Sequence, residues 1–137
     1  MINPARAIVF LTLTCCSESA DPCPGAHVDV ADVLTQAADL AECVGYAPPA
    51  LGAWAFCTHA VEDGGPHDGR FVAYVNDPPE PYWVHGYTNF NDRVVWLSPD
   101  LGALRHELLH AGYLTLNHCY GPWLECLGED HSDECAP

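Results

Sequence analysis

The chain has 137 residues, enough for one compact domain and too few for two of ordinary size. Hydrophobic residues make up 49% of the sequence and aromatic residues 10%, so the chain can bury a core and differs from a disordered acidic polymer. Its formal net charge of -15 disfavours binding to nucleic acids and anionic lipids, and it makes cations the favoured small partners.

The amino-terminal residues have the pattern of an export signal. One basic side chain, Arg6, precedes an apolar run over residues 7–13, which is far shorter than the about 20 residues that span a bilayer. Leu13-Thr14-Cys15-Cys16 resembles a bacterial lipobox, although the residue before the modified cysteine is not the usual Gly, Ala or Ser. We expect residues 1–15 to be a signal peptide, with a lipid on Cys16. The alternatives are a plain signal peptide and a misassigned start.

The other cysteines form an even set. With Cys15 removed and Cys16 lipidated, the remaining ones are Cys23, Cys43, Cys57, Cys119, Cys126 and Cys135. Six cysteines suit three disulfides in an oxidising compartment, and their spacing lacks the Cys-x-x-Cys pairs of structural zinc sites. If all six pair, at least one bond must join the two halves of the chain. We therefore expect an exported protein, either in a bacterial cell envelope or secreted.

The first predicted element is an amphipathic helix that follows a polar tether over residues 16–26. Asp29 is a suitable N-cap, and apolar residues recur at helical spacing from Val30 to Val44. Gly45 supplies the stop signal.

Strands and a second helix are predicted in the rest of the chain. Residues 48–66 allow no firm prediction. Residues 70–75, 82–87 and 93–97 read as strands because β-branched and aromatic residues alternate between turn signals. Strands bracketed by helices indicate an α+β domain over residues 27–137.

The second helix is predicted over residues 99–114. Ser98 is a potential cap, Pro99 suits the first helical position, and Asp100 complements the helix dipole in the first turn. At 3.6 residues per turn, His106 and His110 share one face, opposite an apolar face that includes Leu101, Leu104, Leu108, Ala111 and Thr115.

The residues His106-Glu107-Leu108-Leu109-His110 form the H-E-x-x-H pattern. Two imidazoles four residues apart on a helix can both reach one Zn²⁺, whose bonds to nitrogen measure about 2.0 to 2.1 Å. Zinc lowers the pKa of a bound water towards 7, and Glu107 can then take its proton and later pass it to a leaving amine. The pattern predicts a catalytic zinc site with Glu107 as the general base.

At this motif the chain resembles the zincins, metallopeptidases whose active-site helix carries H-E-x-x-H. The resemblance implies a sheet above the helix, an edge strand that aligns an extended peptide, and a third zinc ligand further along the chain. Metzincins have a Gly and a His where this chain has Tyr113 and Leu116, and they need a later Met that this chain lacks. The expected fold is thus a minimal zincin-like α+β domain, stapled by disulfides.

The third zinc ligand is expected in the carboxyl-terminal part of the chain. Residues 128–133 resemble the Gly- and Asp-rich segment with a His that follows the helix in small bacterial H-E-x-x-H lipoproteins. We therefore predict His106, His110 and His131 as the metal ligands. The alternatives for the third position are His118, Glu125, Glu129 and Asp130.

The overall prediction is an exported, lipid-anchored, monomeric metalloprotease that uses zinc to hydrolyse peptide bonds. An extended substrate could add a strand to an exposed edge at residues 71–75 or 83–87. Tyr113, Tyr120 and His85 are candidates for stabilising an oxyanion. Two alternatives remain open: a metal-binding or interaction lipoprotein without catalysis, and a structural zinc site with a fourth protein ligand.

Overall fold

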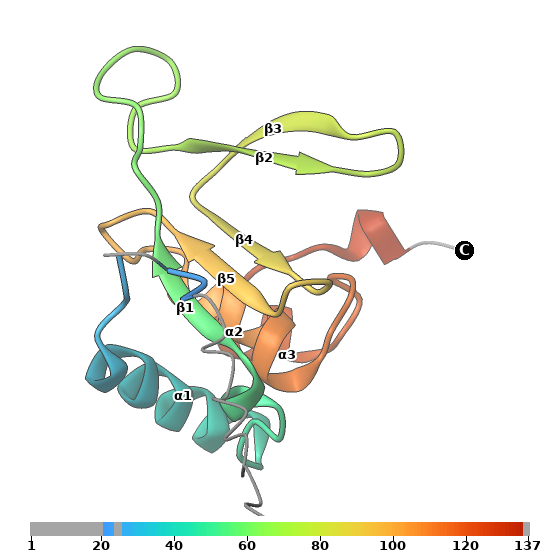
Figure 1. The fold of residues 1–137 in the computed structure, drawn as a ribbon. Helices are drawn as coiled ribbons and strands as arrows, with labels where there is room; N and C mark the ends of the chain where they lie inside the picture. The colour runs from blue at the N-terminus through green and yellow to red at the C-terminus, as the bar shows by residue number, and fades with distance from the viewer. Residues whose placement is uncertain (1–20, 24–25, 136–137) are drawn as a thin grey trace, which may run out of the picture.

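The computed structural model describes residues 21–23 and 26–135, so the predicted signal peptide, the lipid site at Cys16 and most of the tether lie outside the described residues. The predicted α+β class with a small sheet is confirmed (Figure 1). The elements follow in the order α1 (Val30–Val44), η1 (Leu51–Ala53), β1 (Ala55–Thr58), β2 (Phe71–Val75), β3 (Glu80–Val84), β4 (Gly86–Asn89), β5 (Val94–Leu97), α2 (Leu104–Tyr113), α3 (Pro122–Leu127) and η2 (Ser132–Cys135).

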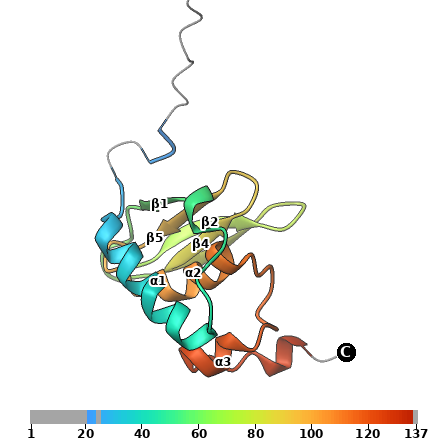
Figure 2. The same ribbon diagram turned by 90° about the horizontal axis from the view of Figure 1, so that it is seen from below.

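The strands form two separate sheets. The larger has the order β1-β5-β4, in which β5 runs parallel to β1 and antiparallel to β4. The second sheet is the antiparallel hairpin β2–β3. In Figures 1 and 2 the helices lie on one side of the larger sheet and the hairpin lies on the other. Strand β4 is an edge strand, and α2 packs beneath it.

Helix α1 has the predicted bounds. The carboxylate of Asp29 accepts a hydrogen bond from the backbone N–H of Ala31 at 2.9 Å, so it caps the first turn. Gly45 ends the helix in the left-handed conformation at φ 98°, which costs glycine little. Its buried face packs against α2 and α3.

The strand predicted over residues 82–87 is wrong as one element, because its two halves belong to different sheets. Val84 pairs with Phe71 in the hairpin, whereas Gly86 pairs with Leu97 in the larger sheet. His85 lies at the crossing point, where its carbonyl accepts a hydrogen bond from the backbone N–H of Ser98 at 2.8 Å. Alternation of side chains along the sequence does not reveal that a strand changes partner.

The start predicted for the second helix is also wrong, since α2 begins at Leu104 rather than at residue 99. The hydroxyl of Ser98 donates to the carboxylate of Asp100 at 2.7 Å and does not cap a helix. The same carboxylate accepts from the N–H of Gly102, and Leu101 takes a left-handed φ of 58°. This side-chain turn replaces the first helical turn that the sequence signals predicted.

The three predicted disulfides are confirmed. They join Cys23 to Cys57, Cys43 to Cys126 and Cys119 to Cys135. The second of these bonds joins the two halves of the chain, as expected, and it ties α3 to α1. Three disulfides indicate an oxidising extracellular environment. Within the described residues, helices are too short or too polar to cross a membrane.

Candidate metal centre

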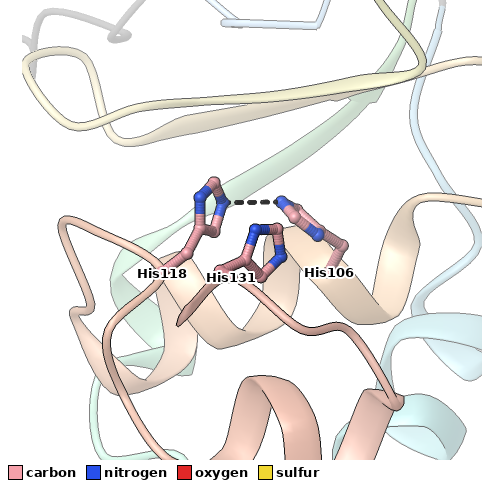
Figure 3. A group of neighbouring side chains, drawn as sticks. All are labelled: His106, His118 and His131. Carbon is pink, nitrogen blue, oxygen red and sulfur yellow. Dashed lines mark hydrogen bonds between the residues drawn. The ribbon is translucent and has the colours of Figure 1, made fainter. Parts of the chain in front are cut away.

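Four histidines converge between α2 and the carboxyl-terminal segment. His106 and His110 lie one turn apart on α2, His118 lies in the loop after that helix, and His131 lies between α3 and η2. His106, His118 and His131 each offer a nitrogen within 4.8 Å of the others (Figure 3). His110 completes the cluster, because its ring lies against those of His106 and His118.

The rings of His106, His110 and His118 form a nearly equilateral triangle. Their ring centroids lie 5.2 Å apart for His106 and His110, 5.1 Å for His106 and His118, and 5.0 Å for His110 and His118. The Nε2 atoms of His106 and His118 face each other at 3.2 Å, as the dashed line in Figure 3 shows.

Each ring of this triangle is held through its Nδ1 atom. Nδ1 of His110 lies 2.7 Å from the carbonyl oxygen of Thr115, which can only accept a hydrogen bond. Nδ1 of His106 contacts a carboxylate oxygen of Glu129 at 2.7 Å, and Nδ1 of His118 contacts one of Glu134 at 2.8 Å. In a neutral ring that donates through Nδ1, Nε2 carries the lone pair that a metal ion needs.

His131 makes different contacts from the other three rings. Its Nε2 lies 3.2 Å from Oε2 of Glu129, and its Nδ1 lies 3.1 Å from Oε1 of Glu134. Its ring stacks on that of His118, with centroids 4.1 Å apart, while its centroid is 6.3 Å from that of His106. Both nitrogens of His131 thus face carboxylates.

Trp123 of α3 forms the floor of the triangle. Its indole is only 1% exposed, and its ring centroid lies 4.6 to 4.8 Å from those of His106, His110 and His118. Its Nε1–H donates to the carbonyl of Asn117 at 3.1 Å, which fixes the loop that carries His118. One buried side chain therefore contacts all three rings.

Glu107 is buried beneath the edge strand β4. It is 4% exposed, and its Oε2 accepts a hydrogen bond from the hydroxyl of Thr88 at 2.6 Å. A Cβ atom on Gly86 would lie 2.7 Å from Cγ of Glu107, so the strand can approach the carboxylate only because this residue is glycine. The backbone of β4 and the side chain of Thr88 together position Glu107.

Burial shifts the pKa of several groups in the site. Desolvation raises the pKa of Glu107 to about 7, although the hydrogen bond from Thr88 opposes the shift. Desolvation lowers the pKa of His110 to about 4, and it lowers that of His106 despite the nearby Glu129. Both helix imidazoles are therefore neutral near pH 7, the form in which histidine binds metals.

Two cavities open onto the site. One, of about 350 Å³, is lined by His106, Glu107, His110 and His118 together with Thr88 and other residues of β4 and its surroundings. The other, of about 560 Å³, reaches His106 and Glu107 from the side of His85 and Asp100. The imidazoles and Glu107 thus line a cleft beside β4.

The remaining predicted site residues lie in different surroundings. Glu129 contacts His106 through its carboxylate, whereas Asp130 forms a local turn by accepting from the N–H of Ser132. The hydroxyls of Tyr113 and Tyr120 both bond to Tyr46 rather than facing the imidazoles. His85 lines the larger cavity, with Nδ1 3.2 Å from the carbonyl of Gly69.

Sequence reasoning missed Trp123, Thr88, Gly86 and Glu134. Helix α3 was not predicted; Pro122 at its first position is a local signal for it, but this signal does not show what the next side chain contacts. A second cluster of possible ligands, Asp21, Cys23 and His27, includes a cysteine that is already in a disulfide.

Comparisons with known protein families, with curated proteins and with solved structures found no match for this chain.

Proposed function

We propose that this protein is a zinc hydrolase of peptide bonds, with His106, His110 and His118 as the metal ligands and Glu107 as the general base. One observation carries the proposal: the ring centroids of three imidazoles stand 5.0 to 5.2 Å apart, and each ring has its Nδ1 next to a hydrogen-bond acceptor. This is the pattern of histidine ligands whose outer nitrogen is fixed by hydrogen bonding.

The spacing of the three rings fits one tetrahedral ion. Zinc–nitrogen bonds of about 2.0 to 2.1 Å at tetrahedral angles separate two nitrogens by about 3.3 Å and their ring centroids by about 5 Å. The Nε2 atoms of His106 and His118 are 3.2 Å apart. When both rings are neutral and donate through Nδ1, their Nε2 lone pairs face each other, and a cation between them would stabilise this arrangement.

The ring-centroid spacing disfavours His131, which stood in the predicted set, although a nitrogen of His131 lies within 4.8 Å of nitrogens of His106 and His118. Its ring centroid is 4.1 Å from that of His118 and 6.3 Å from that of His106, and both values depart from the tetrahedral spacing. A carboxylate only accepts hydrogen bonds, so each His131 nitrogen that faces one acts as a donor. We therefore assign the third ligand position to His118.

The chain supplies the rest of the chemistry from α2 and β4. A zinc ion at this site would provide a Lewis acid that activates water and polarises a carbonyl group. Glu107 would take a proton from the attacking water and return it to the leaving amine. Thr88 holds one oxygen of Glu107 at 2.6 Å, which fixes the carboxylate at the edge of the cleft.

An extended peptide fits the open side of the site. β4 is an edge strand of the larger sheet and borders the cleft of about 350 Å³. A peptide that pairs with this edge would lie across Glu107 and the imidazoles. This edge, residues 86–89, overlaps the predicted 83–87 and lies in the other sheet from the predicted 71–75. Export and a lipid on Cys16 remain part of the proposal.

The experiment measures zinc content and peptide cleavage in the purified, disulfide-intact chain. We expect one zinc per chain, its loss in His118→Ala, and its retention in His59→Ala, a control at an exposed histidine that stacks on Phe71. Glu107→Gln should keep the zinc and lose about 10²- to 10⁴-fold in cleavage rate. Zinc binding without cleavage of a peptide library would support the non-catalytic alternative, and wild-type protein without zinc would overturn the metal centre.

A further inference from the structure

We propose that His131 is a positioning residue, which ties together the two carboxylates that orient the ligand rings of His106 and His118. This inference rests on the proposed function and assigns a role to the carboxyl-terminal tail. It requires that His131 bind carboxylates and not the metal.

The contacts form a continuous chain around the site. Oε2 of Glu129 accepts from Nδ1 of His106 at 2.7 Å and lies 3.2 Å from Nε2 of His131. Oε1 of Glu134 lies 3.1 Å from Nδ1 of His131, and Oε2 of the same carboxylate accepts from Nδ1 of His118 at 2.8 Å. The chain begins on one proposed ligand and ends on another, so a shift of either carboxylate moves the other through His131.

Ring stacking also holds His131 in place. The rings of His131 and His118 are 17° from parallel with centroids 4.1 Å apart, so His131 also covers one face of that ligand. The side chain of His131 is 19% exposed, compared with 36% for Glu129 and 49% for Glu134. His131 is thus the best shielded member of an otherwise solvent-facing network.

A disulfide holds this network against the site. Cys119 follows His118 in the sequence, Cys135 follows Glu134, and the two cysteines are bonded to each other. The short helix η2, which carries Glu134, has no buried residue. Because burial contributes little there, the covalent bond is what keeps the Glu134 carboxylate next to its imidazole partners.

The test combines metal affinity with a count of ligands in His131→Phe, which keeps a flat ring and removes both donors. The zinc dissociation constant is measured by competition with a chelator, and the number of bound imidazoles by X-ray absorption at the zinc edge. We expect the wild type and the variant to have the same number of imidazoles, and we expect zinc affinity to fall about 10- to 100-fold in the variant. His59→Phe serves as the matched control and should change neither value.

Glu134→Gln provides a second variant if His131→Phe does not fold, as judged by circular dichroism. The amide keeps one acceptor oxygen, so Glu134→Gln should weaken zinc binding less than Glu134→Ala, without changing the imidazole count. Loss of one imidazole in His131→Phe would make His131 a ligand and overturn the inference, while leaving a metal centre in place. Unchanged zinc affinity in all three variants would overturn it too. Wild-type protein that binds no zinc would instead remove the proposed function itself.

Discussion

The helix–sheet layer, made of α1, α2 and the larger sheet, and the C-terminal segment, residues 114–135, are stabilised by different kinds of contact. The layer buries a continuous aliphatic core that includes Leu40, Val95 and Leu109. In the C-terminal segment only Pro122 and Trp123 are buried among the described residues. Two disulfides and a set of carboxylate–imidazole contacts hold this segment in place.

This difference divides the candidate site into two halves. The layer supplies His106, Glu107 and His110 on a helix whose other face is packed, so hydrophobic burial fixes their positions. The C-terminal segment supplies His118 and the groups around His131 through directional contacts that water can disturb. A change confined to one half should therefore affect stability and zinc affinity in different proportions, which the following predictions use.

The largest effect is expected from Trp123→Ala, where the two halves meet. Removing a buried Trp costs about 3–5 kcal/mol of unfolding free energy, and here it also removes the floor under three imidazoles. Urea denaturation would measure the loss of unfolding free energy. Competition with a chelator at low temperature, where the variant stays folded, would measure the loss of zinc affinity. Leu40→Ala in α1 should cost about 2–5 kcal/mol yet leave the zinc affinity of the folded fraction unchanged. Equal zinc affinities in the two variants would contradict the division.

A second prediction compares two disulfides that should stabilise the fold by similar amounts. The Cys119–Cys135 bond spans 16 residues of sequence and the Cys23–Cys57 bond spans 34, so each should stabilise the fold by about 3–4 kcal/mol. Replacing the first pair by serine should also weaken zinc binding, because it frees the segment between His118 and Glu134. Replacing the second pair should lower the unfolding free energy alone. Measuring the unfolding transition and the zinc dissociation constant of both double variants would test these two expectations.

Gly86→Ala is expected to produce a smaller effect confined to the helix–sheet layer. The new Cβ atom would lie 2.7 Å from Cγ of Glu107 and 2.8 Å from Cβ of Ala103, so the strand or the carboxylate must shift. Overpacking of this kind costs about 1–3 kcal/mol. Peptide cleavage should fall while zinc affinity stays, since the nearest neighbours of the new Cβ atom belong to Glu107 and Ala103 and not to the imidazoles. Gly52→Ala, which meets open space, is the control and should change neither quantity.

The sequence predicted the elements that local signals define, and it failed where distant contacts decide. Asp29 and Gly45 mark both ends of α1 because a cap and a left-handed stop are local features. The apparent helix start at Ser98 was misleading. The Asp100 carboxylate accepts hydrogen bonds from the Ser98 hydroxyl and the Gly102 N–H, and the turn that they form replaces the first helical turn. The alternation of residue types over residues 82–87 could not show that the chain leaves one sheet at His85 and enters another.

The candidate site follows the same rule. His106, Glu107 and His110 were found because their spacing on one helix is a local pattern, and the structure brings them together as that pattern implies. The third ligand comes from a loop whose path depends on Trp123 and a disulfide, so spacing alone could not choose between His118 and His131. Whether either binds zinc stays a prediction.

The smallest effect is expected from Asp39→Asn, which breaks the ion pair between Asp39 of α1 and Arg105 of α2. Their atoms lie 3.4 Å apart, and the side chains are 54% and 42% exposed, so water screens the pair. The unfolding free energy should change by less than about 1 kcal/mol, with zinc affinity unchanged. Glu134 is about as exposed as Asp39, yet Glu134→Gln should alter zinc binding because its partner is a proposed ligand. A larger loss of stability in Asp39→Asn would mean that ion pairs also support the layer, and the contrast between the two halves would fail.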